Sequence, residues 1–245
     1  NRQQLKRILG GETSRYNPES PVHTTALIFT ILLIVISTVL LLLLGGTSGV
    51  AESIETEGIS ATEPLFYATL EVVFALLGVG FAIRRGTADT LERLGLRWPT
   101  RDDVRWGLGV LLVIFILLIL YGQVISWFIP EDQLQEQNRA AQSQIDAFST
   151  LPLALLLATS AAIGEEVFFR GAIQPIFGLI PTTIFFTVLH TQVLLTPGIV
   201  VIFFIGLLFG LLRQRHSTTA AIIAHFAYNF LLIIFSIITT SGGTV

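Results

Sequence analysis

Six polar residues in apolar surroundings have the types and spacing needed to hydrolyse an amide bond. They are two carboxylates, a guanidinium, two imidazoles and a carboxamide: Glu165, Glu166, Arg170, His190, His225 and Asn229. Placing an ionisable group inside a membrane helix costs free energy unless the group is paired or hydrated. Each of these residues therefore calls for a structural or functional explanation. A carboxylate and an imidazole that share a water can activate it as a nucleophile. A second imidazole, together with a carboxamide, can donate hydrogen bonds to an oxyanion.

Spacing determines which of these side chains lie on one face of a helix. Glu166 and Arg170 are four residues apart, so they share a face and can form an ion pair. His225 and Asn229 have the same spacing on the last apolar segment. Glu165 points about 100° away from Glu166, toward a different neighbour. The sequence therefore predicts an ordering pair and a donor pair, with Glu165 available as a base.

Three different segments carry Glu165, His190 and His225. With a rise of about 1.5 Å per residue, all three fall at similar depths, so we expect them to converge. The same three side chains could form a zinc site of two histidines and one carboxylate, although the chain contains no HExxH motif. We expect no metal and no cofactor. A buried ion-pair network that only joins the helices is a further alternative.

Composition places these residues in a membrane protein. The chain has 245 residues, of which 52% are hydrophobic and 13% charged, and its mean hydropathy is +0.76. A soluble domain carries about 25% charged residues. The absence of cysteine excludes disulfides, thiolate metal sites and a cysteine nucleophile. The net charge of −3 gives no electrostatic case for binding nucleic acid. Since the sequence starts at Asn1 and contains no Met, we expect residues before it.

The predicted fold is all-α and polytopic, with about seven transmembrane helices, because each such helix needs about 20 apolar residues. The predicted segments are Ala26–Leu44, Pro64–Ile83, Trp106–Ile129, Leu151–Phe169, Ile180–Leu195, Gly198–Leu212 and Thr218–Ile238. The fifth and sixth are short and are joined by a turn at Thr196–Gly198. We divide the chain into an N-terminal arm with three transmembrane helices, a four-helix catalytic core and a tail, at residues 1–150, 151–238 and 239–245.

Charge predicts the orientation in the bilayer. Twelve of the 14 Lys and Arg residues fall in the N-terminal arm and in the second and sixth loops. These segments lie on one side if there are seven spans, and the positive-inside rule makes that side cytoplasmic. We therefore expect a cytoplasmic N-terminus and an external C-terminus. The external loop from Glu131 to Thr150 is polar and is expected to form a short surface helix.

Three motifs in order resemble those of the CPBP family, the CAAX proteases and bacteriocin-processing enzymes also called the ABI family. Gly164–Arg170 contains the EExxxR motif, Phe186–His190 the FxxxH motif and His225–Asn229 the HxxxN motif. The small-residue stretch Gly206–Gly210 resembles the close-packed segment between the last two motifs. The resemblance covers about residues 151–238 and is closest to type II CAAX prenyl endopeptidases, which are all-helical, glutamate-dependent intramembrane proteases.

The resemblance implies a role for each motif residue. Glu165 would be the general base, with His190 helping to hold the water. The ordering pair Glu166 and Arg170 would position the site, and the remaining two residues, His225 and Asn229, would form the oxyanion hole. The implied reaction is hydrolysis of a peptide bond near the cytoplasmic leaflet. The substrate would be a membrane-associated peptide or protein, prenylated or not. A non-catalytic membrane partner, such as an assembly factor, complex subunit or immunity-type protein, is the alternative function.

Two features fall outside the family pattern. Members often have a Thr-Gly-Ser-type turn before the last motif, whereas this chain has Arg215–Thr219, and we expect the change to alter substrate access. Glu71 belongs to no motif and is expected about 10 Å deep in the second span, in the opposite half of the membrane from the catalytic cluster. We interpret Glu71 as a packing residue, with contact to a partner membrane protein as the alternative.

Overall fold

The structure is a computed structural model that describes residues 16–58, 60, 62–194 and 196–242. The described part of the chain is helical and contains no β-strand. In chain order its elements are α2 (Pro21–Leu43), α3 (Gly46–Glu57), α4 (Thr62–Val79), α5 (Thr87–Leu94), α6 (Arg101–Ile125), α7 (Glu131–Ala147), α8 (Leu151–Glu165), the π-helix η2 (Glu166–Ile173), α9 (Gln174–Phe177), α10 (Leu179–Leu189), the 3₁₀ turn η3 (Thr191–Val193), α11 (Ile199–Arg215) and α12 (Thr218–Gly242).

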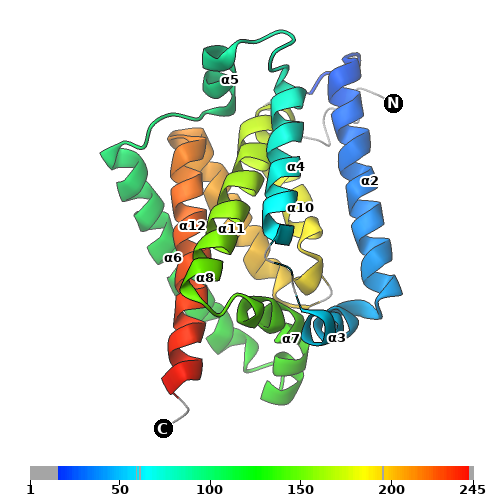
Figure 1. The fold of residues 1–245 in the computed structure, drawn as a ribbon, viewed down its shortest axis with the longest axis vertical. Helices are drawn as coiled ribbons and strands as arrows, with labels where there is room; N and C mark the ends of the chain where they lie inside the picture. The colour runs from blue at the N-terminus through cyan, green and yellow to red at the C-terminus, as the bar shows by residue number, and fades with distance from the viewer. Residues whose placement is uncertain (1–15, 59, 61, 195, 243–245) are drawn as a thin grey trace.

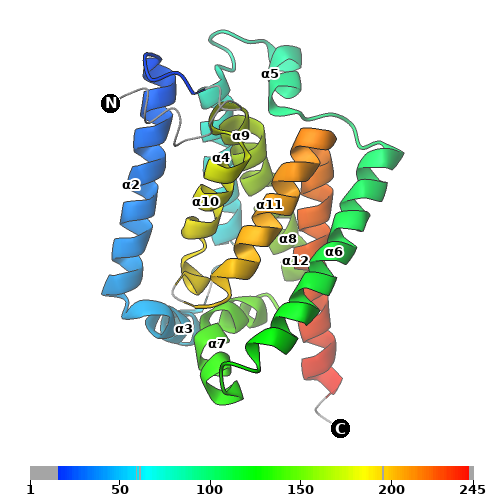
Figure 2. The same ribbon diagram turned by 180° about the vertical axis from the view of Figure 1, so that it is seen from behind.

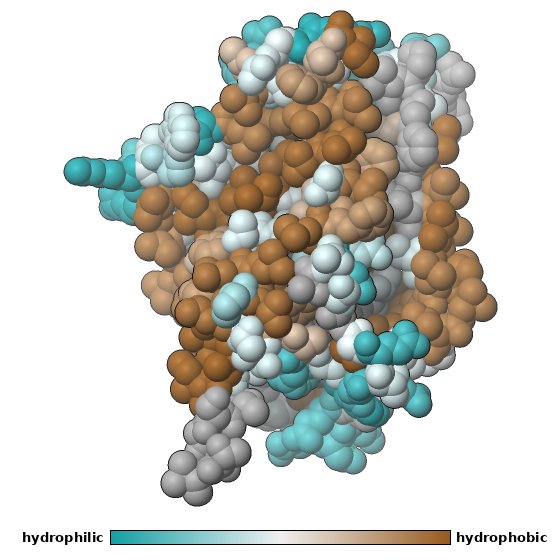
Figure 3. Space-filling view, in the orientation of Figure 1, coloured by the Kyte–Doolittle hydropathy of each residue, from teal (hydrophilic) through white to brown (hydrophobic). Residues whose placement is uncertain are grey.

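Five segments of the described chain are helical, long and apolar enough to cross a membrane. They are Ala26–Leu43, Thr62–Val79, Arg101–Ile125, Leu151–Phe177 and Thr218–Thr239. Their outward faces carry large apolar side chains, and the space-filling view shows an apolar belt between two polar ends (Figure 3). Such a belt matches a bilayer, which requires backbone polar groups to be satisfied within helices. The predicted all-α polytopic membrane fold is confirmed.

The fifth and sixth predicted spans correspond to shorter helices. Helix α10 has 11 residues and ends at Leu189, where the backbone of His190 leaves the helical region and the 3₁₀ turn η3 follows. Helix α11 has 17 residues. The apolar residues after His190 therefore belong to a turn rather than to a continued helix, so the predicted bounds of the fifth span are wrong. Helix α12 continues to Gly242, beyond the predicted end of the last span.

The helices run alternately up and down around α8 (Figures 1 and 2). Helices α4 and α12 pack directly on α8, and α6 packs on α12. Helix α11 joins the same core, where its residues Ile205 and Phe209 and the α12 residue Ala224 are fully buried. Helix α2 lies at the edge of the molecule and touches α10. The catalytic motifs are thus placed on the innermost helices.

The two ends of the molecule differ in charge. Helix α5 and the arginine-rich loops beside it form one end, which the charge pattern predicts to be cytoplasmic. Helices α3 and α7 pack together at the other end (Figure 2), where Arg139 Nε donates to Glu55 Oε1 at 2.9 Å. Helix α7 confirms the predicted surface helix after Glu131.

Candidate active site

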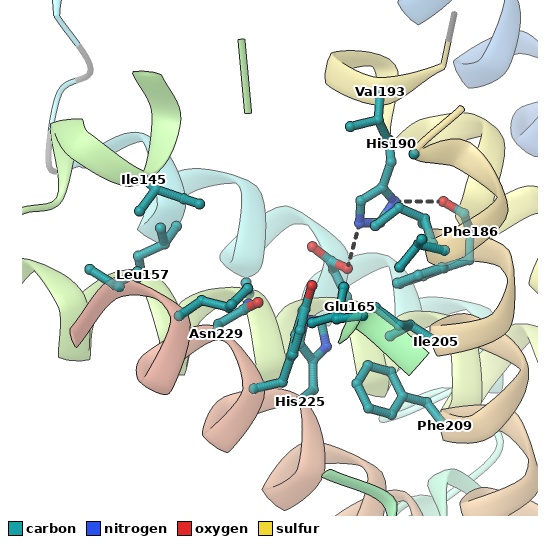
Figure 4. Close-up of a pocket in the computed structure, with 18 of the residues that line it drawn as sticks. Ile145, Leu157, Glu165, Phe186, His190, Val193, Ile205, Phe209, His225 and Asn229 are labelled. Carbon is teal, nitrogen blue, oxygen red and sulfur yellow. Dashed lines mark hydrogen bonds and ion pairs between the residues drawn. The ribbon is translucent and has the colours of Figure 1, made fainter. Parts of the chain in front are cut away.

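The three motifs converge on one region, each from a different element (Figure 4). Glu165 is the last residue of α8, and Glu166 and Arg170 lie in the π-helix η2 that continues it. His190 follows the last residue of α10 rather than lying within the helix. The HxxxN residues are on α12. A π-helical segment inside an α-helix is rare and often marks a functional site.

The ordering pair forms as the spacing predicts. Arg170 NH1 lies 3.1 Å from Glu166 Oε1, and both side chains are almost completely buried, at 1% and 0% exposure. Arg170 NH2 also donates to Gly206 O at 3.0 Å, and its guanidinium lies over the Phe186 ring at 4.2 Å from the ring centre. Both charges are therefore paired, as burial in a low-dielectric interior requires.

His225 joins this pair. Its Nδ1 lies 2.9 Å from Glu166 Oε1, and its ring stacks on Phe209 with centres 4.9 Å apart. The resemblance implied an oxyanion-hole role for His225, and nothing in the sequence indicated that Glu166 would bind it. Glu166 thus orders two motif residues rather than one, because Arg170 and His225 share a single carboxylate oxygen.

Glu165 and His190 face each other across a gap. Their Oε2 and Nε2 atoms are 3.9 Å apart, too far for a direct hydrogen bond. His190 Nδ1 lies 2.8 Å from Phe186 O, and because a carbonyl only accepts, Nδ1 carries the proton. In the neutral ring, Nε2 is then an acceptor. Glu165 Oε2 is buried and has no hydrogen-bond partner among the described residues. Two acceptors at this separation can both receive hydrogen bonds from one water.

A cavity of about 330 Å³ connects four of the motif residues. Its lining includes Glu165, His190 and His225, which the sequence predicted to converge, and also Asn229. The cavity is bounded by residues of α6, α8, α11 and α12. It is large enough for a small segment of a peptide chain. Tyr121 on α6 also lines it, and its buried hydroxyl has no partner among the described residues.

A second cavity of about 470 Å³ reaches Glu165 and His190 from another side and is lined by residues of α2, α4, α8 and η2. Glu71 is among them. A Cβ on Gly164 would overlap Glu71 Oε2 and would lie 2.7 Å from Ala68 Cα, so α4 touches α8 directly before the motif. The expected position of Glu71 in the opposite half of the membrane is therefore wrong.

The reason is the level at which each helix begins. The predicted depths were counted from the first residue of each span, as though all spans began in one plane. Helix α4 begins farther from the α3–α7 end than α8 does (Figures 1 and 2). Glu71 is thereby carried to the level of Glu165, and its ionisable side chain inside an apolar span was the sequence signal for a site residue.

Comparison with known proteins agrees with this geometry. Residues 147–231, about a third of the chain, match the model of a family described as type II CAAX prenyl endopeptidase Rce1-like. Over this segment the chain is similar to the CAAX-protease-like family. No curated protein and no solved structure gives a significant match. The matched family implies CAAX-type intramembrane protease activity, and all three motifs lie within the matched segment.

The glycines of the CAAX-protease-like segment allow close approach, as the resemblance implied. Gln174 Nε2 donates to Gly210 O at 2.8 Å, and a Cβ on Gly210 would overlap the Leu179 side chain. A Cβ on Gly206 would lie 2.9 Å from Phe186 Cδ1. Backbone carbonyls of α11 can therefore accept hydrogen bonds from η2 and α9 side chains.

Two arginines that sequence reasoning assigned to topology alone also hold the π-helix. Arg93 NH1 donates to Gly171 O at 3.0 Å, and Arg213 Nε donates to Arg170 O at 3.3 Å. A Cβ on Gly95 would lie 2.7 Å from Arg213 NH2, so the loop after α5 packs on this guanidinium. No motif marks these residues, because the positive-inside rule already explains arginines in such loops.

The segment that departs from the family turn joins α12 to the loop before α6. Ser217 Oγ donates to the buried carboxylate of Asp103 at 2.6 Å, and Thr218 Oγ1 donates to Leu94 O at 2.6 Å. Thr219 Oγ1 donates to Arg97 O at 2.9 Å. None of these three residues lines either cavity of the described site. The segment therefore fixes α12, and its expected effect on substrate access stays a prediction.

No group of three His, Cys, Asp or Glu side chains within the described residues is arranged to hold a metal ion. For the predicted zinc alternative, His225 uses Nδ1 for Glu166 and His190 uses Nδ1 for Phe186 O. The two rings therefore have Nε2 as the remaining nitrogen. A zinc ion would therefore have to be bound by the Nε2 atoms of His190 and His225 together with the Glu165 carboxylate.

Proposed function

We propose that this protein is a glutamate-dependent intramembrane endopeptidase that hydrolyses a peptide bond near the cytoplasmic leaflet. The observation that carries the proposal is the 3.9 Å gap between Glu165 Oε2 and His190 Nε2 at the wall of both cavities. Both atoms are acceptors when Glu165 is ionised and His190 is neutral. A water that donates to both presents its lone pair to a carbonyl carbon in the first cavity.

The proposed reaction proceeds in two steps. Glu165 takes a proton from the water as the water oxygen bonds to the scissile carbonyl carbon, and the carbonyl oxygen becomes negative. The C–N bond then breaks, and Glu165 returns the proton to the leaving amine. The products are a carboxylic acid and an amine, and Glu165 is regenerated as a carboxylate. No cofactor enters this sequence.

Asn229 and His225 are the proposed donors to the developing oxyanion. The Asn229 carboxamide has N–H donors in every ionisation state of the site. His225 Nδ1 donates to Glu166, so its ring donates at Nε2 only as an imidazolium. Preorganised donors of this kind stabilise the transition state more than the ground state. Asn229 is therefore the donor that does not depend on pH.

The substrate is proposed to be a membrane-associated peptide or protein segment with an extended C-terminal part. The two cavities meet at Glu165 and His190, so a chain could occupy the first and an apolar group the second. Aromatic side chains of Phe74, Phe148 and Phe168 line the second cavity. This lining suits an apolar group, whether a prenyl chain or a large side chain.

The test uses purified protein in nanodiscs and two fluorogenic CAAX peptides that differ only by a farnesyl group on the cysteine. We expect cleavage by the wild type and loss of at least about 100-fold in kcat for Glu165→Gln. Glu131→Gln, an exposed α7 residue, is the matched control and should keep full activity. Failure of the wild type to cleave either peptide, or full activity of Glu165→Gln, would contradict the proposed reaction.

A further inference from the structure

The second cavity has an acidic wall, formed by Glu63 and Glu71 of α4, that the proposed reaction does not use. Glu71 lines this cavity together with Glu165 and His190, where the two cavities meet. It is a half-buried ionisable residue within a membrane-spanning segment. Such residues are costly, face cavities, and pair with other groups. The position of Glu71 therefore calls for a partner.

The charges around Glu71 indicate the sign of that partner. Glu71 interacts electrostatically with Glu165 and Glu166, which carry the same charge when they are ionised. The buried Arg170 donates to Glu166 Oε1 at 3.1 Å and to Gly206 O at 3.0 Å. Like charges repel more strongly in a low-dielectric interior than in water, and a cation beside Glu71 would offset this repulsion. The acidic wall therefore favours a cationic group.

A buried hydroxyl supplies a second acceptor on the same side of the cavity. Ser160 of α8 lines the cavity and is 5% exposed, and its Oγ has no hydrogen-bond partner among the described residues. Ser160 and Gly164 are four residues apart, so they share a helix face. That face touches α4, because a Cβ on Gly164 would overlap Glu71 Oε2. A buried hydroxyl without a partner costs free energy, which a hydrogen-bonding ligand would remove.

The rest of the lining suits the apolar stem of a basic side chain. Leu70, Phe74 and Phe168 line the cavity beside the acidic wall. Lysine and arginine bury their methylene stems along apolar surfaces while the charged end stays with polar groups. An aromatic ring adds attraction for a cation that lies over its face. A lysine ammonium has three N–H donors and no acceptor, which matches a wall of carboxylate and hydroxyl oxygens.

We propose that the second cavity is a specificity pocket for a lysine or arginine side chain of the substrate, at a residue next to the scissile bond. The charged end would pair with Glu71 and donate to Ser160 Oγ. Because the cavity meets the first one at Glu165, the basic residue would lie beside the carbonyl that is attacked. This inference rests on the proposed peptidase function and narrows the large side chain proposed there to a basic one.

The test compares peptides that differ at one residue, which is either lysine or norleucine. Norleucine keeps the stem and removes the ammonium group. The residue is placed in turn on each side of the bond that is cleaved in an unprenylated parent peptide, which mass spectrometry of the products identifies. Initial rates in nanodiscs give kcat/KM for the wild type, Glu71→Gln and Ser160→Ala. The matched control is Glu131→Gln, which removes an exposed carboxylate outside both cavities.

We expect the wild type to prefer lysine over norleucine by at least about tenfold in kcat/KM at one of the two positions, because a hydrogen bond to a charged group is stronger than a neutral one. Glu71→Gln should remove most of this preference, Ser160→Ala should reduce it, and Glu131→Gln should keep it. Equal kcat/KM for the two peptides in the wild type would overturn the pocket, and this comparison needs no variant. A preference that survives in Glu71→Gln would also overturn it.

A binding measurement separates this inference from the peptidase function. The same peptides carry a fluorescein label and are titrated with the wild type and with Glu71→Gln, and binding is followed by fluorescence anisotropy. If the wild type cleaves neither peptide, the peptidase function fails. Tighter binding of the lysine peptide by the wild type, lost in Glu71→Gln, would then still support the pocket, whereas equal affinity for the two peptides would overturn it. Cleavage without any preference overturns the pocket and leaves the peptidase function intact.

Discussion

His225 of α12 is hydrogen-bonded to Glu166 of η2, with 2.9 Å between Nδ1 and Oε1. The same oxygen receives Arg170 NH1 at 3.1 Å. A single buried carboxylate therefore joins the ion pair of the first motif to the proposed oxyanion donor of the third. Any change at Glu166 is expected to alter both, whereas a change at Glu165 alters neither contact.

The two adjacent glutamates should differ in their effect on stability. Glu166→Ala strands the buried Arg170 and removes the partner of His225, so we expect a loss of about 3–5 kcal/mol. Glu165→Ala removes a carboxylate that has an unpartnered oxygen, so unfolding should change little. Both variants should lose peptidase activity. Thermal unfolding of the two purified variants checks the difference, and equal Tm values would refute this division of roles.

Asn229→Ala should lower kcat by about 10²–10³ and leave KM nearly unchanged, because an oxyanion donor acts in the transition state. Asn229→Asp should lower kcat further, since an ionised carboxylate has no donor and repels the oxyanion. Initial rates across a range of peptide concentrations separate the two parameters. A raised KM with normal kcat would make Asn229 a substrate-positioning residue instead.

Removal of metal ions should leave the reaction intact, because the proposed nucleophile is activated by Glu165 and His190. The measurement is peptide cleavage after exhaustive chelation, with metal content determined on the same sample. Restoration of a chelation-sensitive activity by stoichiometric zinc would replace this mechanism with the two-histidine, one-carboxylate alternative.

Glu71→Gln should unfold at the same temperature as the wild type or at a higher one. Glu71 interacts electrostatically with Glu165 and Glu166, so the amide removes one of three neighbouring carboxylates while keeping the shape. Glu71→Ala should unfold at a lower temperature because it enlarges the second cavity. The exposed Glu63, which lines the same cavity, provides the control variant Glu63→Gln. A large loss of stability in Glu71→Gln would show that its ionised form is needed.

The ion pair at the opposite end should stabilise the fold in a pH-dependent way. Hydrogen bonds from Arg139 lower the pKa of Glu55 below its usual value of 4.5. Because the folded pKa is depressed, the contribution is present above about pH 4.5 and is lost as pH falls through the folded pKa. Glu55→Gln should therefore differ from the wild type in Tm at pH 7, and the difference should shrink as the pH falls below 4.5. Glu52→Gln, at an exposed position on the same helix, should show no such convergence.

The sequence predicted the parts of the site that depend on local spacing. Glu166 and Arg170 meet because residues four apart share a helix face, and the apolar segments identified the helices that carry the motifs. The convergence of Glu165 with His190 and His225 at one cavity followed from counting residues along three helices. These inferences need no knowledge of how the helices pack.

The remaining features depend on tertiary contacts. His225 binds Glu166 across 59 positions of sequence, and Arg93 reaches Gly171 across 78, so no local pattern could reveal either contact. The level of Glu71 depends on where α4 starts relative to α8. The end of α10 at Leu189 was not predicted because the sequence continues with apolar residues after the polar stretch His190–Gln192.

The π-helix from Glu166 to Ile173 makes the length of the first motif as important as its composition. A π-helical turn holds one residue more than an α-helical turn would. Deleting one residue of this segment would let a regular α-helix run through it with little rotation of the flanking residues, but the wide turn that carries Glu166 and Arg170 would be lost. Descendants of this chain can exchange side chains here, but a deletion that straightens the segment also changes the backbone on which the first motif lies.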